Sequence, residues 1–432
     1  MRKIFNDERV LQNCKIFRML EEQSAKAHLS FHTPGHKQRG FDITELSYSD
    51  NLSSPRGCIA AAEKDVTEIL GAKKSFLLTD GSTSGILSIF HAAKAMGVKS
   101  VAVCELSHKS VFNVCSLVGI TPLIYPAKQK DKIPYLPTVY ELKTEYTEIF
   151  SKADALFFTS PDYYGGVADL QGAREYCDTT GKLLLVDGAH GGHLHFDKKI
   201  HASGYADFWV DGVHKSLPAL TQGAVVSART DEGAEYLRKA VDIFRTTSPS
   251  YPIMASVEYA VKYPRNTELE RAVRAYANRQ NRVLLQADWT KLYARFGKSA
   301  FEVEKALEKQ GVFAEFCDGY GILFYLSPAT SQEEFDRLIQ VLEELFVEYP
   351  LTAEKEESVT LFPIDGGKEW VPLALAEGRI CAGLCGLFPP CTPLFSLGER
   401  ISGEKLRRLQ NADNVFGVYE NQILVLKEKS EE

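Results

Sequence analysis

The stretch Leu183-Leu-Leu-Val-Asp187-Gly-Ala-His190-Gly191 decides how the rest of the chain is interpreted. A short apolar run ends there in an aspartate. A second apolar run, Ala206-Asp-Phe-Trp-Val210, precedes Val213-His214-Lys215. If both runs are buried neighbouring strands of a parallel sheet, their carboxyl ends lie at one edge of that sheet. The sequence therefore predicts that Asp187 and Lys215 come close together in the fold.

Further short apolar runs lie on both sides of this stretch. They occupy residues 76–78, 100–103, 121–125, 155–158 and 224–227. Helical spacing of apolar residues separates several of these runs, which favours an α/β fold with a mainly parallel sheet covered on both faces. Outside the sheet, helices are predicted over residues 8–21, 253–262, 266–295 and 332–347.

The same pattern predicts three domains along the chain. Residues 1–40 form an N-terminal helix and a His-Thr-Pro-Gly-His arm, residues 41–290 a large domain, and residues 291–432 a small C-terminal α/β domain. The polar helix predicted at 266–295 links the last two. Ser331 and Glu334 have the spacing of a capping box for the helix at 332–347.

Composition excludes several classes of function. The chain has 432 residues, 44% of them hydrophobic and 25% charged, with a net charge of −7, so neither nucleic acid nor an acidic membrane is an expected partner. Nine cysteines without a Cys-x-x-Cys spacing predict neither a disulfide framework nor a zinc ribbon, and Cys381, Cys385 and Cys391 are interpreted as buried apolar residues. No apolar run spans a membrane and the start is not a signal peptide, so we expect a cytoplasmic protein.

Four features point to one chemistry. Asp80-Gly81-Ser82-Thr83 opens a helix, where free N–H groups and hydroxyls favour a phosphate. His108 follows a strand and could stack on an aromatic ring. A lysine such as Lys215 can form a Schiff base with pyridoxal phosphate (PLP), and an acid such as Asp187 can keep its pyridine nitrogen protonated.

Each feature also has an ordinary explanation: a helix cap, a core histidine, a solvated aspartate or a surface lysine. Their order on consecutive strand–helix units favours PLP over that explanation. His190, His193 and His195 suggest a metal only weakly, because a zinc site needs further ligands, and no metal is predicted. A serine hydrolase is disfavoured by the absence of a Gly-x-Ser-x-Gly elbow. His32 and His36 flank a Pro-Gly turn and belong either to a surface loop or to a pocket wall.

The chain also resembles the Orn/Lys/Arg decarboxylase family. The motifs that carry the resemblance are Phe31-His-Thr-Pro-Gly-His-Lys37, Asp80-Gly-Ser-Thr83, Ser107-His-Lys-Ser110, Ser160-Pro-x-Tyr-Tyr-Gly165, Val186-Asp-x-Ala-His-Gly191, His214-Lys-Ser-Leu-Pro-Ala-Leu-Thr-Gln-Gly223 and Thr246-Thr-Ser-Pro-Ser-Tyr251. The match covers about residues 15–265 and returns at Gly378-Arg-Ile380 and Pro389-Pro-x-x-Pro393. It implies the aspartate-aminotransferase fold (PLP fold type I). The chain starts almost at the catalytic part, so it resembles the short form without an N-terminal regulatory domain.

The resemblance also implies roles for single residues. Lys215 would form the Schiff base and Asp187 would pair with the pyridine nitrogen. His108 would stack on one ring face, Ala189 would pack on the other, and His190 would lie beside the ring oxygen. The residues implied to hold the phosphate are Gly81, Ser82, Thr83 and His214. Thr247 and Ser248 would reach the cofactor of a partner subunit, which implies a homodimer or a dimer of dimers.

The implied activity is that of a carbon–carbon lyase: decarboxylation of arginine, lysine or ornithine to the amine and CO2, as in polyamine biosynthesis. Two alternatives remain open: an aminotransferase or another lyase on the same fold, and a non-catalytic PLP-binding relative. The last is motivated by Gly212-Val213, which stand where the family usually has a serine and a threonine, so two hydroxyls next to the lysine are missing. The sequence does not identify the acid that would bind the cationic end of a substrate.

Overall fold

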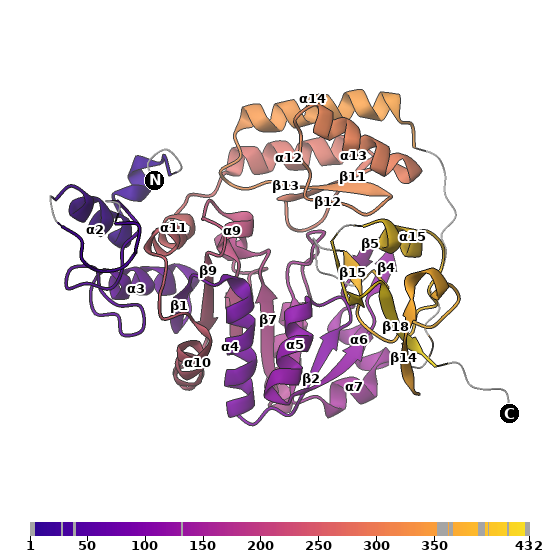
Figure 1. Ribbon diagram of the computed structural model, residues 1–432, viewed down its shortest axis with the longest axis horizontal. Helices are drawn as coiled ribbons and strands as arrows, with labels where there is room; N and C mark the ends of the chain where they lie inside the picture. The colour runs from indigo at the N-terminus through magenta and orange to yellow at the C-terminus, as the bar shows by residue number, and fades with distance from the viewer. Residues whose placement is uncertain are drawn as a thin grey trace.

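The computed structural model describes residues 5–26, 29–37, 40–130, 133–351, 362, 366–387, 394–395, 397–412 and 414–427. A seven-stranded sheet lies at its centre, in the order β1-β9-β8-β7-β6-β2-β3 (Figure 1). Its strands are β1 (Lys74–Leu78), β2 (Ser100–Cys104), β3 (Thr121–Tyr125), β6 (Ala155–Thr159), β7 (Leu183–Gly188), β8 (Phe208–Asp211) and β9 (Ala224–Ala228). All seven strands expected from the apolar runs are therefore present in one sheet.

The sheet is mostly parallel. Strands β3, β2, β6, β7 and β8 pair in parallel, whereas β9 runs antiparallel to both β1 and β8. Parallel neighbours place the carboxyl ends of their strands at one edge, which is where α/β folds bind ligands. The expected α/β fold with a mainly parallel sheet is confirmed.

Both faces of the sheet are covered by helices because alternate strand residues are apolar on each side. Leu77 belongs to one core, while its neighbours Phe76 and Leu78 belong to the other. The helices on the second face are α4 (Gly81–Ala95), α5 (Lys109–Val118) and α10 (Asp231–Phe244). The helices on the first face are α3 (Cys58–Leu70), α6 (Val139–Glu145), α7 (Thr147–Lys152), α8 (Leu170–Thr180) and α11 (Tyr251–Val261).

The N-terminal prediction of one helix over 8–21 is wrong. The structure has α1 (Glu8–Leu11), capped by Asp7, and a separate α2 (Lys15–Ser24). The buried carboxylate of Glu258, from α11, accepts hydrogen bonds from the backbone nitrogens of Lys15 at 2.7 Å and Ile16 at 2.9 Å. A distant side chain thus supplies the cap that starts the second helix, and no local pattern indicates it.

The predicted helix over 266–295 is correct only in its first half. Helix α12 (Thr267–Arg279) ends, and β10 (Val283–Leu285) and β11 (Lys291–Arg295) follow it. They join β13 (Gly321–Tyr325) and β12 (Phe316–Cys317) in a small sheet of order β10-β11-β13-β12. Pairing with β13 overrides the local helical spacing. This sheet packs with α12, α13 (Ala300–Lys309) and α14 (Gln332–Glu348) around its own core.

The capping box predicted at Ser331 and Glu334 is confirmed at the start of α14. In Figure 1 this small-sheet unit stands above the carboxyl edge of the large sheet. It therefore faces the predicted site.

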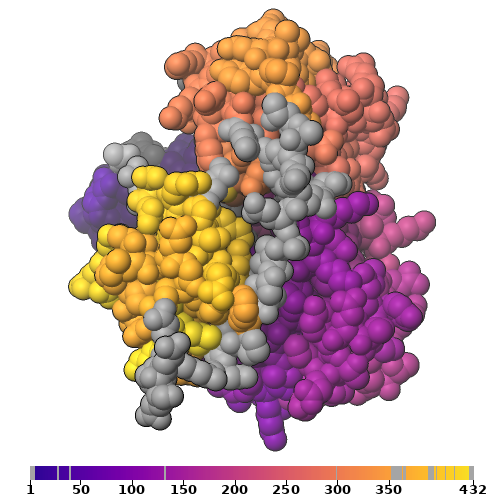
Figure 2. All heavy atoms as spheres, turned by 90° about the vertical axis from the view of Figure 1, so that its right-hand side faces the viewer, coloured from indigo at the N-terminus to yellow at the C-terminus, as the bar shows by residue number. Residues whose placement is uncertain are grey.

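A third unit with its own core follows. It contains β14 (Lys368–Pro372), β17 (Val418–Tyr419), β18 (Gln422–Leu426), α15 (Gly403–Asn411) and the pair β15 (Gly386–Leu387) with β16 (Val415–Phe416). Figure 2 shows this unit in gold and yellow, beside the purple part of the large domain and below the orange small-sheet unit. Arg408 joins it to the small sheet by binding the backbone oxygen of Cys317 at 2.9 Å.

Cys381 and Cys385 are buried in this third core, as the sequence suggested. The Pro389-Pro-x-x-Pro393 motif, with Cys391, lies outside the described residues. The predicted domain boundaries near residues 40 and 290 stay predictions. None of the helices in the described ranges is both long enough and apolar enough to cross a membrane.

Candidate active site

Asp187 and Lys215 are brought to the same edge of the large sheet. Asp187 lies near the end of β7, and Lys215 lies on the short helix α9 (Val213–Ser216), which directly follows the neighbouring parallel strand β8. The turn between β8 and α9 passes so close to the loop after β7 that a Cβ atom at Gly212 would overlap the backbone oxygen of Ala189.

This close approach explains the unusual residues before Lys215. The serine or threonine that the family motif offers would not fit at position 212 on this backbone. Val213 fills the core instead, with 1% of its surface exposed. One missing hydroxyl is therefore replaced by a close backbone approach to Ala189, and the other by the buried side chain of Val213.

Lys215 contacts a chain of polar groups. Its Nζ lies 3.1 Å from Nε2 of His190, and Nδ1 of His190 lies 3.1 Å from the hydroxyl of Tyr325. The hydroxyl of Tyr325 donates to the backbone oxygen of Tyr163 at 3.1 Å. Burial, and then the charges of Lys215 and Lys291, hold the pKa of His190 well below its ordinary value. His190 is therefore a neutral imidazole at neutral pH.

Asp187 is a buried acid with few partners. Its Oδ1 accepts a hydrogen bond from the backbone nitrogen of Ala189 at 2.9 Å, the only one it has in the part of the chain that the structure describes. Burial raises its pKa, while the bond from Ala189 opposes the shift. A buried carboxyl with one hydrogen bond is poorly satisfied and favours a cationic N–H donor.

His108 is the N-cap residue of α5. Its Nδ1 lies 2.8 Å from the hydroxyl of Ser110 and accepts from the backbone nitrogen of Ser110 at 3.2 Å. Burial, followed by the charges of Lys215 and Lys109, lowers the pKa of His108 to about 4. The ring is neutral and fixed, as stacking on a flat aromatic ligand requires.

The start of α4 is open to an anion. Asp80, in the N-cap position, does not cap the helix, because its carboxylate accepts from the backbone nitrogen of Thr246 at 3.0 Å instead. Gly81 has φ = +78°, and no atom lies within 4 Å of the place that a Cβ atom would occupy there. Ser82 is half-buried and Thr83 is exposed. The first-turn N–H groups and these hydroxyls provide the donors that a phosphate cradle needs.

His214 lies on the other side of this cradle region. Its Nδ1 lies 2.8 Å from the backbone oxygen of Gly223. The backbone oxygen of Gln222, the residue before Gly223, accepts from the backbone nitrogen of Gly81 at 2.9 Å. The residues that lead into β9 therefore join His214 to the start of α4. Burial lowers the pKa of His214.

Three hydroxyls at the same edge of the sheet are buried without a hydrogen-bond partner among the described residues: those of Thr79, Ser107 and Thr159. They follow or end β1, β2 and β6, and Thr159 is the strand partner of Asp187. Unsatisfied polar groups gathered at one edge indicate a ligand site. Together with the lysine, the acid, the neutral imidazole and the cradle, they fit PLP.

The loop with Thr247 and Ser248 is not brought to Lys215 within one chain. Both residues are exposed, and the loop is attached next to Asp80 through Thr246. Their expected reach into a partner subunit stays a prediction.

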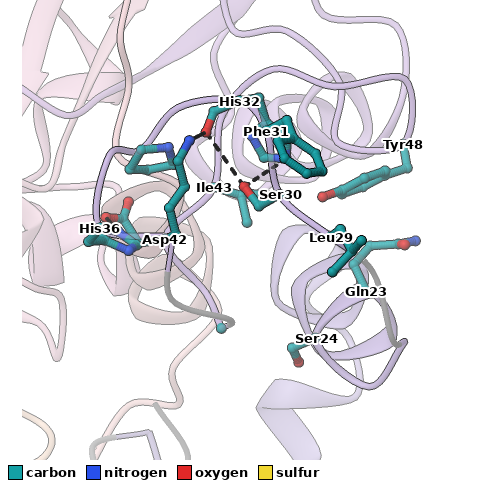
Figure 3. A pocket seen from close by; sticks show the side chains of 13 residues that line it. Gln23, Ser24, Leu29, Ser30, Phe31, His32, His36, Asp42, Ile43 and Tyr48 are labelled. Atoms are coloured by element: carbon teal, nitrogen blue, oxygen red, sulfur yellow. Dashed lines mark hydrogen bonds and ion pairs between the residues drawn. The ribbon is translucent and has the colours of Figure 1, made fainter.

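The other histidines singled out from the sequence have partners of their own. His32 and His36 line a pocket of about 290 Å³ on the N-terminal arm, where Figure 3 shows His36 beside Asp42, 3.0 Å away. His193 pairs with Asp288 at 2.8 Å. Nδ1 of His195 lies 2.7 Å from the backbone oxygen of Gly192, within the 3-10 helix η1 (Gly192–Phe196). The described residues contain no group of three or more side chains arranged to hold a metal.

Sequence reasoning missed the wall that the small sheet contributes. Tyr325 on β13 and Lys291 on β11 both contact His190. Tyr163 packs edge-on against His190, with ring centroids 5.1 Å apart, and its hydroxyl donates to Glu315 at 2.7 Å. Only Tyr163 carried a signal, because it stands in the quoted Ser160-Pro-x-Tyr-Tyr-Gly165 motif.

Comparison with known proteins extends these findings. A family model described as Orn/Lys/Arg decarboxylase, major domain, matches residues 38–284. The uncharacterized protein YaaO of Bacillus subtilis (strain 168) is 29% identical over 455 residues, which cover 92% of this chain and 94% of that protein. An arginine decarboxylase of the same strain is 28% identical over 449 residues, covering 90% and 91%. The solved structure of the constitutive lysine decarboxylase of E. coli matches with a TM-score of 0.72 at 17% identity, covering 96% of this chain and 82% of that one, and so shares its fold.

Proposed function

Because the chain belongs to the Orn/Lys/Arg decarboxylase family of PLP-dependent enzymes, we propose that it removes the carboxyl group of arginine, lysine or ornithine as CO2 and releases the amine. The observation that carries the proposal is the placement of Asp187 near the end of β7 and of Lys215 just after the parallel neighbour β8, with Asp187 buried and held by one described hydrogen bond. When bound, PLP supplies a ring that accepts the electron pair left by CO2.

The chain's own residues bind the cofactor, orient it and transfer the proton. Lys215 binds the cofactor, and Asp187 keeps a proton on its pyridine nitrogen. His108 orients the ring from one face, so that the bond to the carboxylate can stand across it. The open start of α4 holds the phosphate. Lys215, or a histidine beside it, returns a proton to the carbon that has lost CO2.

The small-sheet wall supports a cationic substrate. Glu315 is exposed and receives a hydrogen bond from Tyr163, which packs against His190. Asp318, another acid of this wall, already accepts from the hydroxyls of Tyr164 and Tyr293 and from two backbone nitrogens. We therefore assign Glu315 to the guanidinium or ammonium end of the substrate.

A screen of arginine, lysine and ornithine for CO2 release with added PLP tests the proposal. We expect CO2 from at least one of them without an added keto acid, which an aminotransferase would need. Bound PLP without turnover of any amino acid would favour the non-catalytic alternative.

Replacement of the lysine tests the cofactor site directly. The purified protein should show visible absorbance that borohydride removes, and Lys215→Ala should abolish it and reduce CO2 release by on the order of 10⁴-fold. Lys239→Ala, at an exposed position on α10, should change neither. Absorbance that survives in Lys215→Ala would move the assignment to another lysine.

A further inference from the structure

Lys291 is a second lysine at the site, and the proposed mechanism does not use it. Its side chain is fully buried, and its Nζ lies 3.0 Å from Oδ2 of Asp288. The same ammonium donates to the hydroxyl of Thr290 at 2.8 Å and to the backbone oxygen of His190 at 3.3 Å. Two hydrogen bonds and the ion pair with Asp288 therefore hold the end of the Lys291 side chain in one place.

Lys291 and Tyr325 lie side by side on the small sheet. They are direct partners across the antiparallel pair β11–β13, so their side chains lie on the same face of the small sheet. The ammonium of Lys291 stands over the ring of Tyr325, 4.5 Å from its centroid. The pair therefore contacts His190 at two points, its backbone oxygen and its Nδ1.

The hydrogen bonds of Tyr325 determine where His190 carries its proton. A phenol has one proton, and Tyr325 donates it to the backbone oxygen of Tyr163, which can only accept. Toward His190 the phenol oxygen must then accept, so Nδ1 of His190 carries the proton. Nε2 is left with a lone pair that faces Nζ of Lys215.

We propose that the cross-strand pair Lys291 and Tyr325 is a positioning device, which fixes His190 with its proton on Nδ1 and its Nε2 lone pair facing Lys215. The inference rests on the proposed function in one respect, that Lys215 is the lysine that binds the cofactor. Through this pair, the small sheet controls how readily the amine of Lys215 gives up its proton.

The test measures the amine of Lys215 in cofactor-free protein. Trace acetylation at pH 8, followed by mass spectrometry, gives the labelling rate of Lys215 relative to the exposed Lys239. In Tyr325→Phe, Nδ1 of His190 loses the phenol oxygen that accepts its proton. His190 can then carry the proton on Nε2 instead, so the ammonium of Lys215 loses the lone pair to which it donates. Because a hydrogen bond to a charged group contributes roughly 1.5–3 kcal/mol, labelling of Lys215 should rise about tenfold or more.

A second variant separates positioning from charge. Lys291→Met combined with Asp288→Asn removes both charges of the pair and leaves the net charge unchanged. His190 then loses the anchor at its backbone oxygen, and labelling of Lys215 should rise by a smaller factor, about threefold. Tyr163→Phe is the matched control for labelling, because that hydroxyl bonds Glu315 and not His190.

A lower unfolding temperature with unchanged labelling in both variants would overturn the proposal and leave the pair a purely structural role. The labelling needs no PLP and no turnover. A failure of the decarboxylase proposal, seen as absent CO2 release from the unaltered protein, is therefore distinguishable from a failure of this one.

Discussion

Asp187 and Asp318 are carboxylates on opposite walls of the same site, yet they are bonded very differently. Asp187, on the large sheet, accepts one described hydrogen bond. Asp318, beside the small sheet, accepts from two tyrosine hydroxyls and two backbone nitrogens. The difference separates the two acids: Asp187 is left for a ligand to satisfy, whereas Asp318 holds the geometry of the small-sheet wall.

Two buried histidines of the large domain should make the fold sensitive to acid. Burial lowers the pKa values of His108 and His195 from 6.5 to about 4, so the unfolded chain binds their protons first as the pH falls below 6.5. The stability that these neutral histidines allow is complete above pH 6.5 and is lost as the pH falls toward 4. At pH 5 the two groups together should lower the free energy of unfolding by about 4 kcal/mol. The difference between the free energies of urea unfolding at pH 7.5 and pH 5 measures this loss.

His108→Gln is the control for this pH effect, because it removes one of these groups and should reduce the change by about 2 kcal/mol. Equal free energies of unfolding at the two pH values in the unaltered protein would contradict the neutral state assigned to these histidines.

Asp187→Asn keeps the shape of the acid but removes its charge. The pyridine nitrogen would lose its counter-ion, so CO2 release should fall by about 100-fold, while the free energy of unfolding should stay the same or rise, because a poorly satisfied buried acid is removed. Steady-state kinetics and urea unfolding on the same preparation give both numbers. A large decrease in the free energy of unfolding would show that Asp187, like Asp318, mainly holds the structure.

Asp318→Asn should show the opposite pattern. The hydroxyls of Tyr164 and Tyr293 lose a charged acceptor, so the free energy of unfolding should drop by about 2 kcal/mol. The rate at saturating substrate should change by no more than a few-fold. If the rate falls as it does in Asp187→Asn, the proposed division between the two walls is wrong.

Glu315→Gln should produce the smallest effect of the four. The exposed carboxylate contributes one charge to the cationic end of the substrate, so KM should rise about tenfold with little change in kcat. Glu308→Gln, on the exposed side of α13, is the matched control. An unchanged KM would move the recognition of the cation to another group.

The sequence predicted the large sheet well because strands buried on both faces appear as continuous apolar runs. It also predicted that Asp187 and Lys215 come close together, because the carboxyl ends of parallel strands lie at the same edge of a sheet. It could not predict Lys291 and Tyr325, because their role depends on the pairing of β11 with β13, and that segment of the sequence suggested a helix. Gly212 was interpreted as a loss of hydroxyls, and only its approach to Ala189 shows why glycine stands there.

The cap that Glu258 provides for α2 has a consequence for the order in which the chain folds. The bonds from Lys15 and Ile16 to Glu258 join residues 243 and 242 positions apart. During synthesis at about 5–20 residues per second, α2 therefore waits more than about ten seconds for the residue that caps it. The beginning of the polypeptide is among the last parts of the large domain to settle, and its apolar side chains remain available to chaperones for that interval.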